Sequence, residues 1–339
     1  MIVQKNVSLK NLNTFGIEAI AKHFVMFKSI GELKIIFSLP EYKNKKHLTI
    51  GGGSNLLFTS EIIDRLVLQN KIKGIEIIDE NDKEILLKVG AGEIWHDFVL
   101  YVISKNWGGI ENLSLIPGTV GAAPMQNIGA YGVEIKDVFH SLEAYEISSG
   151  TIKTFTLEEC KFGYRTSIFK QEAKGKYVIT SVTFKLSKQP VFNISYGAIS
   201  DTLAQMGVTQ LSVKAISDAV ISIRQSKLPD PSEIGNAGSF FKNPEIPVSV
   251  FEKIKIQYPE IPSYPATAGN IKVPAGWLIE QCGWKGKTFG HTGVHKNQAL
   301  VLVNYGKAKG EEIKALSVEI QKSVKKKFGI ELEAEVNFV

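Results

Sequence analysis

The sequence has little cysteine and no long hydrophobic run, and each absence excludes a class of protein. Its 339 residues include only Cys160 and Cys282, which lie far apart and form no CxxC motif. Neither a disulfide framework nor a zinc ribbon is therefore predicted, and both are expected to be buried thiols in a reducing compartment. No stretch approaches the roughly 18 uninterrupted apolar residues of a spanning helix, and the N-terminus lacks an apolar export signal. We therefore expect a cytoplasmic protein without a membrane partner.

Metal-binding patterns and strongly charged segments are also scarce. Of the six histidines only His291 and His295 are close together, in HTGVH, where Glu does not follow the first histidine and no acidic partner is near. No metal site is predicted from this pattern. The 40 Lys and Arg residues exceed the 34 Asp and Glu residues by a modest +6, and the densest basic run, 322–329, is typical of a solvated helix end. Nucleic-acid binding is not expected, whereas a mildly basic protein suits phosphorylated substrates.

Three familiar catalytic or nucleotide-binding motifs are absent. A dinucleotide fingerprint starting at Gly51 would need glycine where Leu56 stands, and a P-loop ending in GKT would need glycine at Gln281. Ser239 lacks the GxSxG elbow of a hydrolase nucleophile. A Rossmann domain, a P-loop and nucleophilic hydrolysis are therefore disfavoured.

A length of 339 residues predicts two or three domains, and the pattern of apolar residues predicts both strands and helices. The first third alternates short strands with turns, and apolar residues at helical spacing predict a helix over 94–107. Strands are predicted over 141–160 and 177–188, followed by a helix that ends before Pro229 and Pro231, where a domain boundary is expected. A long helix over 310–329 and a strand over 331–339 close the chain.

Two glycine-rich stretches attract most attention. Residues 115–132, LIPGTVGAAPMQNIGAYG, contain four glycines, three alanines and two prolines but no charged side chain. Residues 51–55, GGGSN, offer free backbone amides that could form an anion-binding nest, although a plain tight turn is the alternative. A backbone that carries mostly glycine and alanine can lie directly against a large flat cofactor. Asn127 and Tyr131 would then supply polar contacts to it.

Three further residues have both a chemical and a structural interpretation. Arg165 lies among aromatic residues in FGYRTSIFK and could equally pair with a surface carboxylate. Ser239, in GNAGSFFKNP, could be a general acid in a dry pocket or a turn residue. Glu335 would share a strand face with Glu333 and Asn337, and taken alone it could face solvent.

Eight motifs in one order and spacing give the sequence a family resemblance. NTFG, GGGSNLL, SLIPGTVGAAPMQNIGAYG, YRTSIFK, KLPDP, GNAGSFFKNP, PAGWLIEQCGWKG and EAEV cover nearly the whole chain. In these motifs the chain resembles the UDP-N-acetylenolpyruvoylglucosamine reductases (MurB). Within that family it resembles the larger subtype, which has a tyrosine-bearing loop. The resemblance implies an α+β, three-domain flavoprotein with a non-Rossmann FAD-binding fold of the vanillyl-alcohol oxidase (PCMH) type. It implies FAD-binding parts at 1–70, completed by 328–339, and at 71–222, with a substrate-binding domain at 223–327.

The resemblance also implies a reaction and a set of site residues. NADPH would reduce FAD, and hydride would pass to the enolpyruvyl group of UDP-N-acetylglucosamine enolpyruvate in peptidoglycan precursor synthesis. Arg165 and Glu335 would stabilise charge, and Ser239 would donate a proton. The cofactor residues implied are Gly51, Gly52, Gly53, Ser54, Asn55, Pro117, Gly118, Thr119, Gly121, Ala122, Asn127, Gly129, Ala130 and Tyr131. The substrate residues implied are Tyr164, Tyr196, Lys227, Asn243 and Gln298.

The sequence departs from the family pattern at two positions and leaves two rival functions open. Ala198 stands where an acidic residue is usual, which puts the anchoring of the tyrosine loop in doubt, and Asn337 replaces a common arginine. The rivals are an FAD-binding or redox-sensing module without turnover and an oxidase of the same flavin fold. The protein is expected to be a monomer.

Overall fold

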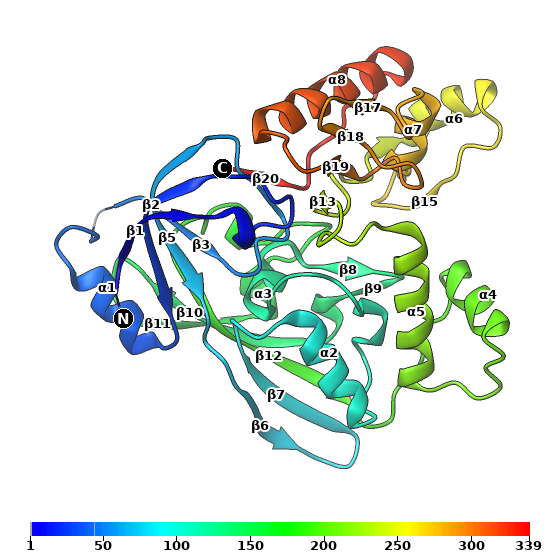
Figure 1. Cartoon of the computed structure of the whole chain (residues 1–339). Helices are drawn as coiled ribbons and strands as arrows, with labels where there is room; N and C mark the ends of the chain where they lie inside the picture. Colours follow the sequence, from blue (N-terminus) through cyan, green and yellow to red (C-terminus); the bar gives the residue numbers. More distant parts are fainter. Residues whose placement is uncertain (1, 44) are drawn as a thin grey trace. The chain divides into compact units, whose positions relative to one another are not determined.

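The computed structural model describes residues 2–43 and 45–339, which divide into two compact units (Figure 1). Among the described residues, unit 1 consists of 2–7, 21–43, 45–52 and 64–226, and unit 2 of 8–20, 53–63 and 227–339. Each unit therefore combines segments that are far apart in the sequence. The division into three domains stays a prediction.

Unit 1 begins with a four-stranded sheet, ordered β1-β2-β5-β3, in which β3 and β5 are parallel. Its strands are β1 (Gln4–Ser8), β2 (Ile20–Phe27), β3 (His47–Ile50) and β5 (Ile62–Asn70). Helix α1 (Ile30–Ser38) buries Leu33, Ile36 and Phe37 in the core of this part. Ser29 caps the helix, because its side chain accepts the amide hydrogen of Glu32 at 3.2 Å.

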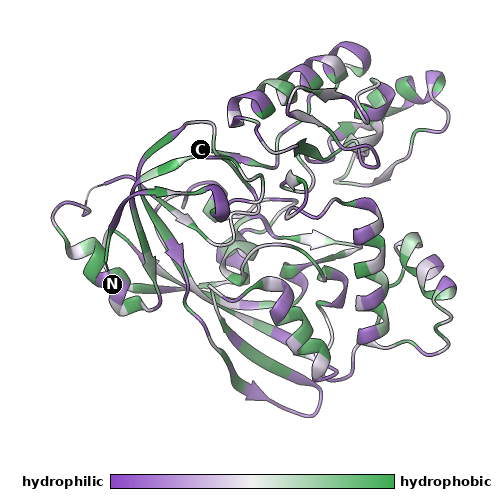
Figure 2. Ribbon diagram, viewed as in Figure 1, coloured by the Kyte–Doolittle hydropathy of each residue, from purple (hydrophilic) through white to green (hydrophobic). Residues whose placement is uncertain are grey.

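The second part of unit 1 is an antiparallel five-stranded sheet whose core is larger than the other two described in this unit. The order is β11-β10-β12-β7-β6. The strands are β6 (Ile75–Glu80), β7 (Glu84–Gly90), β10 (Phe139–Glu146), β11 (Ile152–Thr156) and β12 (Tyr177–Ser187). Figure 2 shows hydrophobic and hydrophilic residues mixed along β7, whose side chains alternate in burial. Helix α2 (Trp95–Ser104) confirms the predicted helix, and the Trp95 ring meets that of Phe184 edge-on at 5.9 Å.

Two further helices of unit 1 pack together in a small separate core. They are α4 (Gly197–Gln205) and α5 (Val213–Lys227). Ile199 and Leu203 of α4 pack with Ile216 and Val220 of α5. The predicted end of α5 before the prolines is confirmed, since α5 stops at Lys227.

One predicted strand of unit 1 is half wrong. Residues 151–160 were expected to be extended, but the chain turns into helix α3 (Leu157–Cys160) after β11. Thr156 and Glu159 form a capping box, in which each side chain accepts the other residue's backbone amide hydrogen. The capping box therefore starts a helical turn at the point where the predicted strand was expected to continue.

Unit 2 is assembled from short strands and three helices. Its strands are β4 (Leu56–Leu57), β13 (Gly235–Asn236), β14 (Glu245–Pro247), β15 (Tyr264–Pro265), β16 (Asn270–Lys272), β17 (Thr288–Phe289), β18 (Thr292–Val294), β19 (Leu302–Asn304) and β20 (Asn337–Phe338). Its helices are α6 (Val248–Gln257), α7 (Ala275–Gln281) and α8 (Gly310–Phe328). The sheets are ordered β13-β19-β18-β17 and β14-β16-β15.

Helix α8 shows why the C-terminal residues fold as they do. Ile313, Leu316, Ile320 and Val324 are buried on one face, and Gly329 ends the helix with a positive φ of 70°. The strand predicted over 331–339 is shorter than expected, since only β20 is formed there, in parallel with β4.

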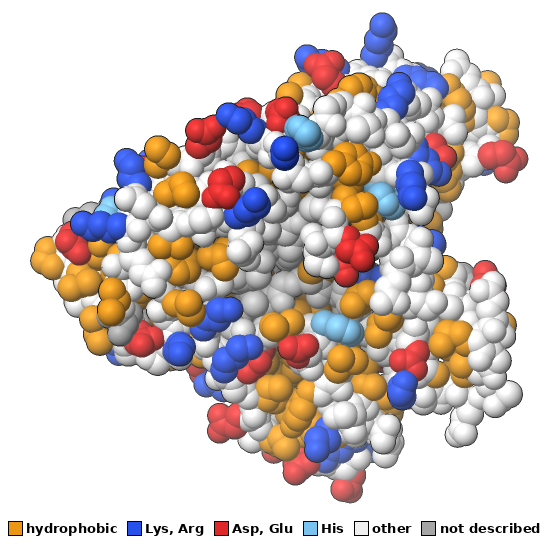
Figure 3. Space-filling model, in the orientation of Figure 1, with side chains coloured by type: hydrophobic (Ala, Val, Ile, Leu, Met, Phe, Trp, Pro, Cys, Tyr) orange, Lys and Arg blue, Asp and Glu red, His pale blue; other side chains and the backbone are white. Residues whose placement is uncertain are grey.

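The surface carries both signs of charge. Basic and acidic side chains are interspersed on the face shown in Figure 3, as the modest net charge suggested. No helix within the described ranges has the length and apolar character needed to cross a membrane. The mostly antiparallel strand pairs and the separate helices confirm the predicted α+β class.

Candidate active site

The first turn of α2 holds the start of the glycine-rich stretch. The Trp95 indole N–H donates to the carbonyl oxygen of Leu113 at 2.9 Å, and the Trp95 amide donates to that of Gly118 at 3.1 Å. Between these contacts the amide of Leu115 donates to Nδ1 of His96 at 3.0 Å. Leu115 has a positive φ of 58°, which is unfavourable for a leucine, so these contacts hold a strained backbone in place.

His96 is an uncharged acceptor in this arrangement. Nδ1 receives the Leu115 amide hydrogen, so the proton of the neutral ring is assigned to Nε2. Burial lowers the pKa of His96, the nearby charge of Arg224 lowers it further, and Asp97 acts in the opposite direction. The imidazole is therefore neutral near pH 7.

Glycines of the two glycine-rich stretches pack closely against other parts of unit 1. A Cβ atom on Gly52 would lie 3.3 Å from Cα of Gly118, and one on Gly51 would overlap the Thr119 side chain. A Cβ atom on Gly121 would lie 2.5 Å from Cβ of Ala91. Close packing of the protein itself therefore accounts for glycine at positions 51 and 121, and the cofactor role of the two stretches stays a prediction.

Two buried polar atoms in unit 1 nevertheless fit a bound group. Oδ1 of Asn112 and Oγ1 of Thr49 have no hydrogen-bond partner within the described part of the chain. Asn112 is 1% exposed, and its Nδ2 already donates to the carbonyl oxygens of Tyr131 and Asn193, each at 2.9 Å. A buried acceptor without a partner is costly, so both atoms suit a ligand with N–H and O–H groups, such as FAD.

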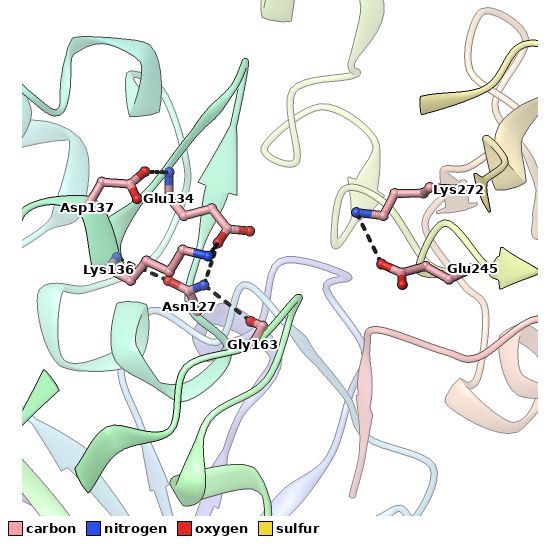
Figure 4. Close-up of polar contacts among 7 residues, drawn as sticks. All are labelled: Asn127, Glu134, Lys136, Asp137, Gly163, Glu245 and Lys272. Carbon is pink, nitrogen blue, oxygen red and sulfur yellow. Dashed lines mark hydrogen bonds and ion pairs between the residues drawn. The ribbon is translucent and has the colours of Figure 1, made fainter. Parts of the chain in front are cut away.

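Asn127 is a hub of the second glycine-rich stretch (Figure 4). Its Nδ2 donates to Glu134 at 2.8 Å and to the carbonyl oxygen of Gly163 at 3.2 Å, while its Oδ1 accepts the amide hydrogen of Lys136 at 3.1 Å. It is fully buried with a φ of 46°. Its side chain is thus engaged by the protein, and a role in cofactor binding, which stays a prediction, would involve its backbone.

Arg165 lies in a tight turn beside this hub. Gly163 and Thr166 exchange backbone hydrogen bonds at 3.1 and 3.3 Å, which places Tyr164 and Arg165 at the two central positions. Arg165 has a φ of 54°, and its Nη2 donates to the carbonyl oxygen of Gly129 at 2.6 Å. The structure therefore brings the predicted catalytic arginine to the predicted cofactor stretch.

Tyr131 and Arg224 form a second polar group in unit 1. Burial raises the pKa of Tyr131, whose hydroxyl is hydrogen-bonded to the Arg224 guanidinium. Burial likewise lowers the pKa of Arg224, whose Nε has no hydrogen-bond partner among the described residues. The ring of Tyr196, at the start of α4, meets that of Tyr131 edge-on at 5.4 Å.

In unit 2 the structure brings Ser239 and Glu335 onto neighbouring backbone. The amide of Glu335 donates to the carbonyl oxygen of Phe240 at 2.8 Å, and Asn55 Nδ2 donates to the carbonyl oxygen of Glu335 at 3.2 Å. Ser239 is exposed and follows Gly238, whose positive φ of 69° and hydrogen bond to Asn236 fix the turn. Arg165 belongs to unit 1, whereas Ser239 and Glu335 belong to unit 2.

Two predicted substrate residues meet at the start of α7 in unit 2. Asn243 Oδ1 accepts the amide hydrogen of Ala275 at 2.9 Å. A Cβ atom on Gly276 would lie 3.1 Å from Oε1 of Gln298. Nearby, Lys272 and Glu245 are paired across β16 and β14 at 3.4 Å (Figure 4). Lys227, the third, is exposed where α5 ends.

Sequence reasoning missed His96, Asn112, Glu134 and Arg224. Glu134 alone had a local signal, because Glu134 and Asp137 have capping-box spacing before a short helix. The others contact residues that are distant in the sequence, which no local pattern indicates.

Comparisons with known proteins match both parts of the chain to known families. Residues 230–339 match the family model described as the UDP-N-acetylenolpyruvoylglucosamine reductase C-terminal domain, and residues 21–156 match an FAD binding domain. The chain is 56% identical to the UDP-N-acetylenolpyruvoylglucosamine reductase of Flavobacterium johnsoniae and 53% identical to that of Amoebophilus asiaticus. In both comparisons all of each chain is covered.

A solved structure gives the same result for the fold. The crystal structure of the reductase from Thermus caldophilus superposes with a TM-score of 0.68, at 23% identity, over all of this chain and 99% of that one. Together with the matching FAD binding domain, this confirms the predicted flavoprotein fold and FAD as the cofactor.

Proposed function

Because the chain belongs to the UDP-N-acetylenolpyruvoylglucosamine reductase family, we propose that it makes UDP-N-acetylmuramate for peptidoglycan. The reaction is the NADPH-dependent reduction of the enolpyruvyl group of UDP-N-acetylglucosamine enolpyruvate. Bound FAD supplies hydride transfer between NADPH and C3 of that group. The observation that carries the proposal is the Arg165 guanidinium, held at 2.6 Å from the carbonyl oxygen of Gly129 in the predicted cofactor stretch.

Arg165 has the charge that this reduction requires. Hydride addition at C3 leaves negative charge at C2, delocalised into the adjacent carboxylate. A guanidinium fixed by a turn and by Gly129 can stabilise that charge without reorganising, an effect worth about 3 to 4 kcal/mol in the barrier. Glu335 assists this charge stabilisation in the proposal.

Ser239 is the proposed proton donor to C2. Its hydroxyl is exposed, and the hydrogen bond from Gly238 to Asn236 fixes the backbone beside it. A hydroxyl is more acidic than the C–H bond that forms, so the proton can move downhill. General acid catalysis of this kind contributes roughly 10² to 10⁴ in rate.

The remaining site residues have binding roles in the proposal. Lys227 contacts the diphosphate, while Asn243, Gln298 and Tyr164 contact the nucleotide sugar. Tyr196 is the covering-loop tyrosine of the larger subtype, and its edge-on contact with Tyr131 supports this. We also keep the three-domain division, a monomeric state and a cytoplasmic location as parts of the proposal.

The proposed cofactor residues come from both glycine-rich stretches. Residues 51–55 contact the pyrophosphate, and the others line the rest of FAD. These others are Pro117, Gly118, Thr119, Gly121, Ala122, Asn127, Gly129, Ala130 and Tyr131. The unpartnered atoms of Thr49 and Asn112 support a polar ligand in unit 1.

Anaerobic stopped-flow measurement of flavin absorbance tests the function. NADPH should bleach the flavin, and the enolpyruvyl substrate should restore the colour within one turnover while UDP-N-acetylmuramate forms. A reduced flavin that the substrate leaves unchanged and that regains its colour only when oxygen is then admitted would favour the oxidase. A flavin that neither reductant nor substrate changes would favour a binding or sensing module. A folded, colourless protein that takes up no FAD would contradict the cofactor assignment.

A further inference from the structure

We propose that Glu134 is a positioning residue for Arg165, acting through Asn127 across a closed ring of contacts. The inference rests on the proposed function, because it assumes that Arg165 is the catalytic cation. Glu134 is not among the predicted site residues, so the inference adds a residue to the proposed site.

The ring can be followed from one contact to the next, partly in Figure 4. Glu134 accepts from Asn127 Nδ2 at 2.8 Å, and the same amide group donates to Gly163, which opens the turn containing Arg165. Arg165 in turn donates to Gly129 at 2.6 Å. Gly129 is paired with Glu134 across the two-stranded sheet of β8 (Gly129–Ala130) and β9 (Val133–Glu134), which closes the ring.

Steric fit makes the ring specific. A Cβ atom on Gly129 would lie 2.8 Å from Cγ of Glu134 and 3.2 Å from Nη1 of Arg165. The absence of a Cβ atom at Gly129 therefore lets both side chains lie close to this strand residue. Asn127 and Arg165 both have positive φ, so their backbones depend on tertiary contacts to stay in place.

Glu134 is held firmly at its own end. Its backbone amide donates to the Asp137 carboxylate at 2.8 Å, and its own carboxylate pairs with Lys136 Nζ at 2.9 Å. The Glu134 side chain is 23% exposed and that of Lys136 44%. Both contacts use Oε2 of Glu134, but the Lys136 side chain can be replaced without touching the Asn127 bond, so the ion pair can be removed by itself.

The test compares Glu134→Ala, Glu134→Gln and Lys136→Met in the FAD-loaded protein. Glu134→Ala should slow reoxidation by the enolpyruvyl substrate roughly 10- to 100-fold, because small misplacement of a catalytic group has effects of this size. Reduction by NADPH and the FAD dissociation constant should stay within about threefold of wild type. Glu134→Gln, which keeps an acceptor for Asn127, should recover most of the lost rate, and Lys136→Met should resemble wild type.

Other outcomes overturn the positioning role. Unchanged reoxidation in Glu134→Ala would show that the ring does not set Arg165. An equal loss of FAD affinity and of both half-reactions would show a merely structural residue. If Lys136→Met slowed reoxidation as much as Glu134→Ala does, the ion pair between Glu134 and Lys136, and not the Asn127 bond, would be responsible for the effect.

A second measurement does not depend on turnover. It uses NMR spectra of apoprotein labelled with ¹⁵N-arginine. The Nε–H signal of Arg165 is assigned as the signal that disappears in Arg165→Lys. This signal should shift in Glu134→Ala and much less in Lys136→Met. An unmoved signal would contradict the proposal even if the wild-type protein proved inactive. Wild-type inactivity with a shifted signal would instead contradict the proposed function and leave the positional link between the two residues standing.

Discussion

The Nδ1 atom of His96 accepts the amide hydrogen of Leu115 at 3.0 Å, on a backbone that leucine rarely adopts. This contact joins the first turn of α2 to the glycine-rich stretch, and only the neutral imidazole can make it. The conformation of a predicted cofactor loop is thereby linked to the protonation state of one side chain.

Stability should decrease at acid pH through His96. Its pKa is lowered in the folded state, so below about pH 6.5 the unfolded chain takes up the proton first. This histidine therefore lowers the free energy of unfolding as the pH falls from 6.5, by at most about 1.4 kcal/mol per pH unit. In His96→Asn, which can keep an acceptor for Leu115, urea unfolding should show a weaker loss between pH 7.5 and 5.5.

A matched control uses His140, which is exposed on β10 and contacts Ser141. His140→Asn should retain the full pH dependence of wild type. If both variants show the same profile, His96 does not carry the effect.

Gly121→Ala should destabilise unit 1. The added methyl group would lie 2.5 Å from Cβ of Ala91, which belongs to the core of the five-stranded sheet, and overpacking of this kind costs about 1 to 3 kcal/mol. Gly31→Ala is the control, because Gly31 is exposed in α1 with Ser29 Oγ at 3.7 Å from the new atom. That variant should gain up to about 1 kcal/mol. Equal urea midpoints for the two variants would contradict the close contact.

Thr49→Val should have opposite effects on the apoprotein and on FAD binding. Removing a buried hydroxyl without a partner should leave the free energy of unfolding unchanged or raise it. If the hydroxyl serves FAD, the dissociation constant should rise roughly 2- to 10-fold, the value of one hydrogen bond. Thr180→Val is the matched control, because Thr180 Oγ1 donates to the carbonyl oxygen of Glu143 at 3.0 Å. It should lose about 1 kcal/mol with no change in FAD affinity.

Ser239→Ala should separate the two half-reactions. Flavin reduction by NADPH should be nearly intact, while reoxidation by the enolpyruvyl substrate should slow by roughly 10² or more, because the proton donor is gone. Stopped-flow absorbance measures both steps. Equal slowing of the two would remove Ser239 from the proton-donor role.

Lys227→Ala should raise KM for the UDP substrate more than it lowers kcat, since a diphosphate contact is present in both ground and transition states. Lys214→Ala, on the exposed side of α5 in an ion pair with Asp218, is the control and should change neither constant. A fall in kcat at constant KM would show that the diphosphate contact is misassigned.

The sequence predicted the elements whose signal is local. The helical spacing of Trp95, Phe98 and Val102 led directly to α2, and Pro229 marked the end of α5. The 3₁₀ helix of residues 120–126 inside the glycine-rich stretch was not predicted, because its Pro124 and small residues give no periodic signal.

The site could be predicted only residue by residue. The motif that contains Arg165 was recognised, but its contact with Gly129 spans 36 residues, and that of Asn127 with Gly163 also spans 36. Such contacts depend on tertiary folding, so the protein ligands of Asn127 and the packing of Gly121 on Ala91 required the structure. The same holds for Asn112, whose unpartnered oxygen appears only once burial is known.

Val339 bonds to a segment of unit 2 that is made much earlier than itself. The carbonyl oxygen of Val339 accepts hydrogen bonds from the amide and hydroxyl of Thr59, at 2.7 and 3.0 Å and 280 positions apart. At about 5 to 20 residues per second, a ribosome needs roughly 15 to 55 s to make the intervening chain. During that time β4 has no partner strand, so unit 2 can complete this pairing only after residues 337–339 have been made and have left the ribosome.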